Sequence, residues 1–184
     1  MTKRDRHVVE IAGVRRELPL FEVGPNVRIA VFNLLGDTEI VRAAAAGLAE
    51  KLSSLEADAL VTAETKSVPL VYELAAELAL PWVVLRKSYK PYMGEALSVE
   101  TRSITTGTPQ TLYLDEKDYP LVKARRVVLV DDVISTRSTI EAMRRLMERA
   151  GAEVLAEAAV FTEGEGSDGV IALGHLPLFS GEDA

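Results

Sequence analysis

The chain has 184 residues, of which 48% are hydrophobic, with a formal net charge of −7 and no cysteine. This length suits one domain with a substantial core, and the missing cysteines exclude a disulfide framework, a thiolate metal site and a cysteine nucleophile. The negative charge argues against general nucleic-acid binding, which depends largely on cations that neutralise phosphates. The charged N-terminus and the absence of an 18-residue apolar run argue against a signal peptide and a membrane span, so we expect a soluble cytoplasmic protein.

The first half of the chain predicts alternating strands and helices. Apolar residues form strand-like runs or recur at helical spacing, and Asp37 or Thr38 is a candidate N-cap for the first helix. The expected order is strand, helix, strand, helix and strand, over residues 27–35, 36–55, 57–63, 68–80 and 81–86.

Residues 87–116 interrupt this alternation, because the segment is polar and only residues 97–105 and 110–115 are strand-like. A buried strand, a helix and another strand are then expected over residues 124–130, 138–151 and 153–161. Alternating strands and helices predict an α/β fold, with a parallel sheet flanked by helices. Such sheets bind ligands beyond the carboxyl ends of their strands.

The stretch VVLVDDVISTRST, Val127 to Thr139, places Asp131 and Asp132 where a buried strand is expected to end. Two adjacent carboxylates favour a shared partner such as a cation or a diol. Hydroxyls and backbone N–H groups at the start of the next helix can hold a phosphate, although an ordinary helix cap also explains them. The hydroxyl-rich turn comprises Ser135, Thr136, Arg137, Ser138 and Thr139.

Basic side chains near loops and strand ends are compatible with an anion site in this acidic protein. Each of them alone is more often a solvated surface charge. They are Lys66, Arg86, Lys87, Lys90, Lys123, Arg125, Arg126 and Arg137.

The stretch from Val127 to Thr139 resembles the signature of the type I phosphoribosyltransferases: four apolar residues, two acids and two apolar residues before a turn usually written T-G-x-T. VTAETKSVPLVYELA is similar to the pyrophosphate loop of that family, RKSYK to the basic stretch before its active-site loop, and residues 87–116 to that mobile loop with its β-hairpin. The resemblance implies a single domain with an N-terminal segment (1–26), a core (27–161) and a C-terminal tail (162–184).

This resemblance implies an enzyme that transfers 5-phosphoribose from phosphoribosyl diphosphate to a nucleobase, giving a nucleoside monophosphate and pyrophosphate in purine salvage. Asp131 and Asp132 would hold the ribose hydroxyls, directly or through the cofactor Mg²⁺, and residues 135–139 would bind the 5′-phosphate. Arg86 and Lys87 match positions that act across a dimer interface in some members, so a homodimer is implied. The pyrophosphate site would comprise Thr65, Lys66, Ser67, Arg86, Lys87 and Lys90.

The nucleobase is expected to be adenine, because members that use 6-oxopurines usually have an acid where this chain has Ser135. Phe32 and Asn33 are candidate base contacts, although an arginine common in adenine enzymes is replaced here by Asn33. A plain core position is the alternative for Phe32. The loop also has SITTGTPQ in place of the Ser-x-Glu-Tyr stretch of adenine enzymes.

Arg137 stands where the T-G-x-T turn of the family has glycine, and Ser67 stands where its pyrophosphate loop often has glycine next to a cis peptide. Glycine reaches positive φ at low cost and lets backbone N–H groups approach a phosphate. Two outcomes are open for Arg137: a helical or bridge conformation with a guanidinium contact to the phosphate, which we favour, or a side chain that blocks the site.

Two other functions remain open. The same site could sense phosphoribosyl diphosphate in a non-catalytic regulator, or the acid pair could belong to an unrelated phosphate enzyme or receiver domain. A haloacid-dehalogenase site would need the pattern D-x-D, but Val133 occupies the third position. A receiver would carry its acid pair early in the chain.

Overall fold

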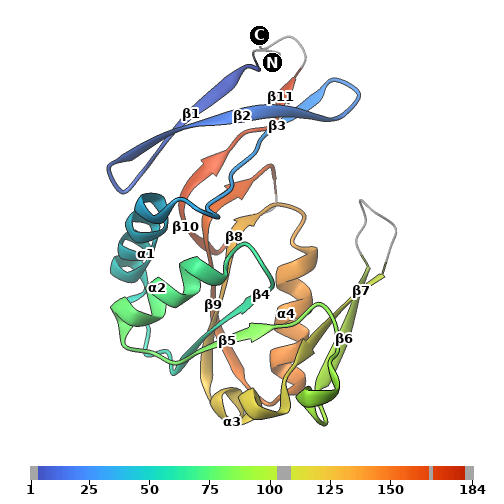
Figure 1. Cartoon of the computed structure of the whole chain (residues 1–184). Coiled ribbons are helices and arrows are strands. Elements are labelled where there is room, and N and C mark those ends of the chain that lie inside the picture. Colours follow the sequence, from blue (N-terminus) through green and yellow to red (C-terminus); the bar gives the residue numbers. More distant parts are fainter. Residues whose placement is uncertain (1–3, 103–108, 166–167, 181–184) are drawn as a thin grey trace.

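The structure is a computed structural model that describes residues 4–102, 109–165 and 168–180. Its centre is a five-stranded parallel sheet with the strand order β10-β9-β8-β4-β5, which confirms the expected fold class. Helices α1 and α2 cover one face, and helix α4 covers the other (Figure 1). The strands are β4 (Ala59–Ala63), β5 (Trp82–Leu85), β8 (Arg126–Ile134), β9 (Glu153–Glu163) and β10 (Val170–Leu176).

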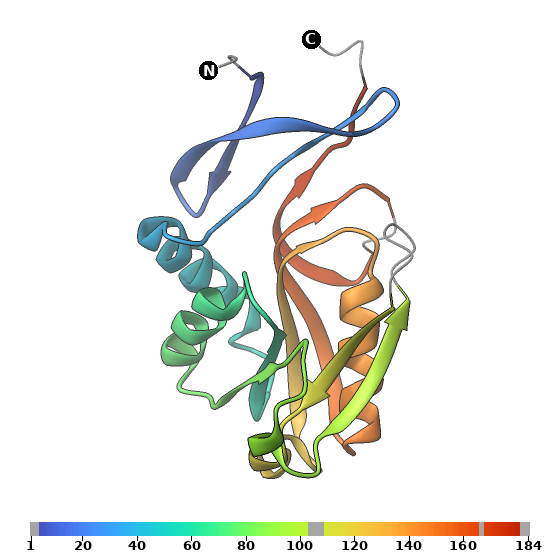
Figure 2. The same ribbon diagram turned by 45° about the vertical axis from the view of Figure 1, so that its right-hand side comes forward.

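A second, antiparallel sheet lies beyond the carboxyl ends of these strands, and we call it the hood sheet (Figures 1 and 2). It is built from both ends of the chain, with the strand order β1-β2-β3-β11. The chain crosses between the two sheets twice, after β3 and after β10. The hood strands are β1 (Arg6–Ile11), β2 (Val14–Gly24), β3 (Val27–Ala30) and β11 (Phe179–Ser180).

The hood sheet differs from the sequence-based expectation in two respects. Residues 27–35 were expected to form a strand of the alternating α/β pattern, but β3 ends at Ala30 and pairs antiparallel with β2. The segments 1–26 and 162–184 also contain strands, and β10 extends the parallel sheet. Strand β1 alternates between exposed and more buried residues over only six positions, and β2 keeps such alternation only in its first half, so neither gives a long periodic pattern.

The helices begin near the residues that the sequence indicates. Asp37 caps α1 (Thr38–Leu52), where its Oδ1 accepts a hydrogen bond of 3.1 Å from the Ile40 backbone N–H. Arg16 of β2 donates to both oxygens of Asp37 at 2.7 and 2.9 Å, which connects the hood sheet to α1 and lowers the pKa of the Asp37 carboxyl. The other long helices are α2 (Val68–Leu78) and α4 (Ser138–Arg149).

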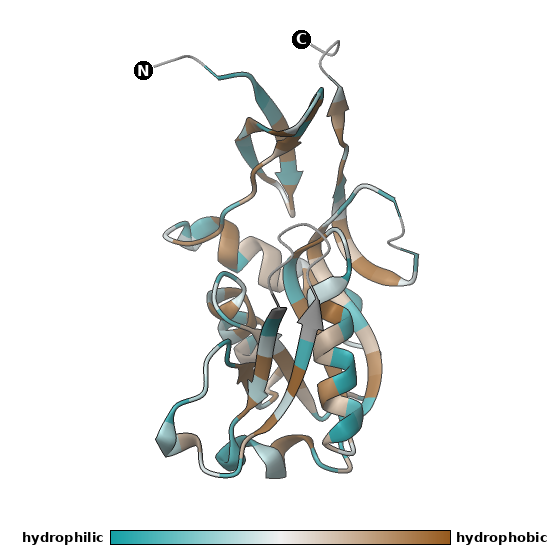
Figure 3. Cartoon of the chain, turned by 90° about the vertical axis from the view of Figure 1, so that its right-hand side faces the viewer, coloured by the Kyte–Doolittle hydropathy of each residue, from teal (hydrophilic) through white to brown (hydrophobic). Residues whose placement is uncertain are grey.

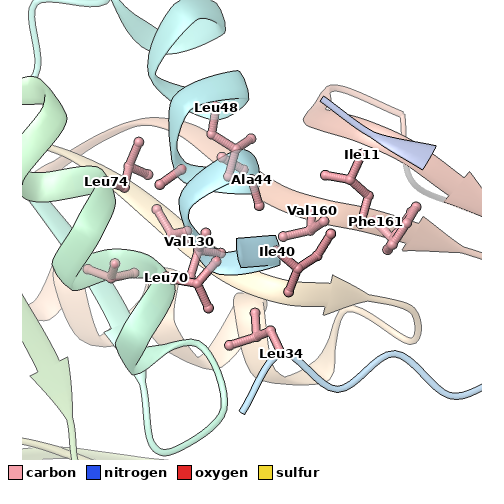
Figure 4. Packing of buried hydrophobic residues seen from close by; sticks show 14 of the residues in the cluster. Ile11, Leu34, Ile40, Ala44, Leu48, Leu70, Leu74, Val130, Val160 and Phe161 are labelled. Atoms are coloured by element: carbon pink, nitrogen blue, oxygen red, sulfur yellow. The ribbon is translucent and has the colours of Figure 1, made fainter. Parts of the chain in front are cut away.

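Side chains of the central strand alternate between the two faces of the sheet. Val128 and Val130 of β8 pack with α1 and α2, whereas Val127 and Leu129 pack with α4 and a β-hairpin. Figure 4 shows Leu48 of α1 and Leu70 of α2 on the first of these sides, and there Ile11 of the hood sheet lies close to Phe161. Both layers are buried, so the sheet and the loops at its carboxyl edge have a packed support.

The hairpin expected within residues 87–116 is present as strands β6 (Leu97–Arg102) and β7 (Pro109–Leu114). Its backbone is attached to α4, because Arg149 Nη1 donates to the Ser98 carbonyl at 2.9 Å and Arg145 Nη2 donates to the Glu100 carbonyl at 3.3 Å. Hydrophilic and hydrophobic residues alternate along this hairpin and α4 (Figure 3). The hairpin tip, residues 103–108, lies outside the described residues.

Short helical segments complete the fold: η1 (Pro91–Met93), η2 (Glu116–Asp118) and α3 (Tyr119–Val122). None of the helices in the described ranges is long and apolar enough to cross a membrane.

Candidate active site

The predicted site residues gather at the carboxyl edge of the parallel sheet. The loop after β4, the residue Lys87 after β5 and the end of β8 surround a cavity of about 240 Å³. Its lining combines basic, acidic and hydroxyl side chains, which suits a charged ligand bound with its counterions. The cavity is lined by Ala63, Glu64, Thr65, Lys66, Ser67, Lys87, Asp131, Asp132, Val133 and Thr139.

The acid pair lies within β8 and not after it, because the strand continues to Ile134. The pairing of β8 with β4 ends at Leu129, whereas its pairing with β9 continues to Ile134. The acid pair lies in this last part of β8, where no strand among the described residues covers the second edge. The apolar pattern of β8 in the sequence does not show that its pairing with β4 ends before its pairing with β9.

Ser67 connects the loop after β4 to the acid pair. Its Oγ donates to Asp131 Oδ1 at 2.6 Å and accepts from the Asp132 backbone N–H at 3.0 Å, and the residue is 1% exposed. The glycine that the family often has at this position could not form either contact.

Asp131 carries the largest electrostatic perturbation of the site. Burial and the neighbouring Asp132 carboxylate raise its pKa to about 7, and the Ser67 hydrogen bond opposes that shift. Part of the side chain faces the cavity, but protein atoms enclose most of the carboxyl group. A group with such a pKa close to a second carboxylate is a common feature of functional sites.

The acid pair fits a hard divalent cation such as Mg²⁺. Two crowded carboxylates repel each other, and a cation between them or beside them relieves that repulsion. In the described part of the chain no cluster of three or more acidic, histidine or cysteine residues could hold a metal alone. Mg²⁺ usually keeps several waters and substrate oxygens in its coordination shell, so two carboxylates are enough.

The loop between β4 and α2 contains a cis peptide bond, Glu64–Thr65. The backbone N–H groups that follow lie at the start of α2, where unpaired donors and the helix dipole favour an anion. Thr65, Lys66 and Ser67 all line the cavity, so the structure brings the predicted pyrophosphate loop to the acid pair.

Glu64 is a site residue that the sequence analysis did not identify. Its carboxylate forms an ion pair with Arg86 Nε and accepts a hydrogen bond of 2.9 Å from the Lys87 backbone N–H. Arg86 is therefore engaged by Glu64 and is not among the residues that line the cavity, whereas Lys87 is. Lys90 precedes η1 and lies outside this lining.

The turn between β8 and α4 surrounds a smaller cavity of about 40 Å³. All five residues of the predicted 5′-phosphate turn line it, together with Asp131. The hydroxyl groups of Thr136 and Ser138 are 3.2 Å apart and hydrogen-bonded. This arrangement brings the two halves of the motif, acids and hydroxyls, to one place.

Arg137 adopts the left-handed conformation, with φ 62° and ψ −4°, so the expected helical or bridge conformation is wrong. A non-glycine residue in this region costs roughly 1–3 kcal/mol unless its surroundings fix it. Its side chain also differs from the expectation, because Nη2 pairs with Glu157 Oε2 at 2.5 Å. The guanidinium is thus directed to β9. The backbone of Arg137 has a positive φ, which glycine adopts at low cost.

Phe32 is a core residue, as the alternative interpretation had it. It is 5% exposed, and its ring meets that of Phe161 edge to face at 5.0 Å. Asn33 is exposed at the crossing after β3, and its Oδ1 accepts from the Leu35 backbone N–H at 3.2 Å. Of the two candidate base contacts, only Asn33 is accessible to a ligand.

The parallel sheet, the hood sheet and the loops at the carboxyl edge define an α/β protein with the type I phosphoribosyltransferase fold. The family model described as the phosphoribosyl transferase domain matches residues 34–171, three quarters of the chain. The chain belongs to this family, which confirms the resemblance seen in the sequence.

Two curated relatives are hypoxanthine/guanine phosphoribosyltransferases. That of Methanobacterium lacus is 32% identical over 72% of this chain and 65% of its own length. That of Ferroglobus placidus is 31% identical over 76% of this chain and 70% of its own length. The chain thus spans about two thirds of the length of these relatives, and slightly less for the first.

Solved structures similar to this chain are adenine phosphoribosyltransferases. The enzyme of Thermoanaerobacter pseudethanolicus has a TM-score of 0.66 and 26% identity, covering 77% of this chain and 84% of its own. The enzyme of Rhodothermus marinus has a TM-score of 0.64, covers 93% of this chain and 94% of its own and, at 24% identity, shows the fold alone. Sequence and structure therefore relate the chain to purine enzymes of two specificities.

Proposed function

We propose that this protein is a purine phosphoribosyltransferase that transfers 5-phosphoribose from phosphoribosyl diphosphate to adenine, releasing pyrophosphate. One observation carries the proposal: the loop 65–67, the acid pair and the turn 135–139 meet around two adjacent cavities. Asp131 lines both cavities and links them. These three elements provide sites for a diphosphate, a diol and a monophosphate, the polar parts of phosphoribosyl diphosphate.

The reaction breaks the bond between the anomeric carbon and the diphosphate oxygen and forms a bond to a base nitrogen, whose proton passes to the released pyrophosphate or to water. Positive charge develops on the ribose ring, and the carboxylates of Asp131 and Asp132 stabilise it. Lys66, Lys87 and the backbone N–H groups at the start of α2 stabilise the leaving diphosphate. The turn 135–139 fixes the 5′-phosphate and thereby orients the ribose.

Mg²⁺, when bound with the substrate, neutralises part of the diphosphate charge and so makes it a better leaving group. Asp131 and Asp132 would hold the ion, directly or through the ribose hydroxyls and water. The residues at the cavity then bind and orient the substrate, and Ser67 keeps the Asp131 carboxylate in one position through its 2.6 Å hydrogen bond.

Adenine is the first choice of base because Ser135 occupies a place where 6-oxopurine enzymes usually have an acid. Hypoxanthine and guanine form a second candidate, which the names of the curated relatives favour. Pyrophosphate release measured with Mg²⁺, phosphoribosyl diphosphate and each of several bases tests both. We expect release at least about tenfold faster with adenine than with hypoxanthine or guanine.

Three outcomes of this assay would change the proposal. Faster release with hypoxanthine or guanine would assign the second specificity. Tight binding of phosphoribosyl diphosphate without transfer to any base would favour a regulator that senses this ligand. Neither binding nor turnover would contradict the phosphoribosyltransferase function altogether.

The segment 87–116 is expected to close over the bound substrate, because the reaction must exclude water. Backbone amides of β6 and β7 should exchange more slowly with deuterium when phosphoribosyl diphosphate and Mg²⁺ saturate the site. Hydrogen exchange followed by mass spectrometry measures this, with peptides of β1 as an internal control. Equal exchange with and without ligand across the whole segment would contradict a closing lid.

Arg86 and Lys87 follow β5 side by side, and we propose a homodimer in which this edge of one protomer approaches the site of the other. Light scattering across a range of protein concentrations measures the molar mass and so tests for the homodimer. The mass of a monomer at micromolar concentration would contradict the proposed homodimer. We also propose a cytoplasmic location.

A further inference from the structure

Three charged side chains form a network directly behind the turn 135–139. Arg137 Nη2 contacts Glu157 Oε2 at 2.5 Å, and Arg144 donates to Glu157 Oε1 from Nε at 3.0 Å and from Nη2 at 2.9 Å. Each carboxylate oxygen of Glu157 thus serves one guanidinium. Arg137 precedes α4 and Arg144 lies two turns into it, so the network fixes the start of this helix on the sheet.

Glu157 is held firmly by its place in the fold. It lies on β9, its side chain is 5% exposed, and its backbone faces Leu129 of β8 and Val170 of β10. A carboxylate in such a place needs ion-pair partners, because burial of an unpaired charge is unfavourable. The network therefore connects the turn 135–139 to β9, a strand with a neighbouring strand on each side.

We propose that Glu157 is a positioning residue for phosphate binding, acting through Arg137. The inference rests on the proposed function, since it assigns the turn 135–139 to the 5′-phosphate. At φ 62°, glycine would need no support, whereas arginine does. Glu157 supplies that support by holding the guanidinium, so the turn keeps its phosphate-binding shape with arginine in the place of glycine.

This mechanism predicts that Glu157 matters only while residue 137 is arginine. Glu157→Gln leaves one acceptor oxygen and turns N–H donors toward the second guanidinium, which breaks the network. The turn then loses its anchor, and its N–H groups and hydroxyls no longer converge on one anion. In an Arg137→Gly background the backbone holds the left-handed conformation by itself, and the loss of Glu157 should have little further effect.

The test is a double-mutant cycle of Glu157→Gln and Arg137→Gly, with ribose 5-phosphate as the probe in calorimetry. We expect Glu157→Gln to weaken binding at least about tenfold and Arg137→Gly to weaken it about threefold, through the lost positive charge. The double variant should match Arg137→Gly within about twofold. Glu153→Gln on the same strand is the matched control, since Glu153 is exposed and pairs with Arg126 at the start of β8, whereas the turn follows the end of that strand.

Two results would overturn the proposal: equal losses from Glu157→Gln in both backgrounds, or no loss in the arginine background. If Glu157→Gln does not fold, Glu157→Asp replaces it in the cycle. Aspartate keeps the negative charge but is one methylene shorter, so it should weaken binding of ribose 5-phosphate with arginine at position 137 and have little effect with glycine there. In turnover assays the Glu157 variants should raise KM for phosphoribosyl diphosphate more than they lower kcat. A wild-type protein that binds ribose 5-phosphate but transfers no phosphoribose from phosphoribosyl diphosphate to any base would reject the proposed function and leave this inference standing.

Discussion

Asp131→Asn combined with Asp132→Asn is expected to lower kcat/KM for phosphoribosyl diphosphate by at least about 100-fold, the scale of losing a main electrostatic stabiliser of a transition state. The two amides cannot hold Mg²⁺ as carboxylates do and cannot stabilise positive charge on the ribose. Steady-state pyrophosphate release and calorimetry with phosphoribosyl diphosphate measure the loss. Binding as tight as in the wild type would show that the ribose lies elsewhere.

The same double variant should be as stable as the wild type or more stable, and the difference should depend on pH. Burial and the Asp132 carboxylate raise the pKa of Asp131 to about 7 in the folded protein, from an ordinary value of 3.8. The carboxyl is therefore protonated in both states below about pH 3.8, and no penalty exists there. Between about pH 3.8 and 7 the unfolded state has released this proton and the folded state still holds it, so stability falls as pH rises through this range and levels off above it.

Urea unfolding at pH 4.5, 6 and 8 tests this pH dependence. The stability gained by the double variant should grow with pH and level off above about pH 7, at roughly 1–3 kcal/mol. Asp168→Asn, at an exposed position, is the control for removal of a negative charge and should show no such trend. A variant less stable than the wild type at pH 8 would mean that the acid pair supports the fold.

Arg137→Gly combined with Arg144→Met is expected to destabilise the protein by about 3–5 kcal/mol, because it leaves the buried Glu157 carboxylate without either partner. Each guanidinium is partly exposed, at 27% and 37%, so one removed singly should cost less than both. Arg145→Met is the control on the same helix, since within the described residues this side chain donates to the Glu100 carbonyl at the surface and does not contact Glu157. Thermal and urea unfolding give the comparison.

Adding Glu157→Met to that pair should restore most of the stability. A buried ion network replaced by apolar side chains of similar size is often neutral or stabilising. Recovery would show that the double variant lost stability because the Glu157 carboxylate was buried without a partner, and not because the packing of the arginines was lost. A triple variant as unstable as the double one would contradict this account.

The layered α/β core was predictable because its signals are local. Helices α1, α2 and α4 each carry apolar residues at helical spacing next to a cap or a turn, and the strands between them are short apolar runs. Residues 65–67 and 131–139 were identified through a motif, and the carboxyl-edge rule predicts that they meet.

The features that the sequence did not predict depend on contacts between residues that are far apart along the chain. β11 is two residues long and exists only because it pairs with β3. Glu157 and Glu64 look like ordinary acids in a strand and after one, and their roles follow from arginines 13 or more positions away. Arg137 was assigned the wrong conformation because intrinsic preference disfavours positive φ, whereas an ion pair across the sheet outweighs it.

The two crossings of the chain between its sheets also limit how the hood sheet can move. A rigid body attached at two points turns easily only about the line through those points, and translation along or across that line stretches covalent bonds. Here the points are the segment after β3 and the short link from β10 to β11. Arg16 and Asp37 add a third, breakable attachment beside the first. Ile11 and Leu18 of the hood sheet also belong to the buried core that contains Phe161, so any rocking of this sheet over the carboxyl edge would separate apolar side chains as well as this ion pair.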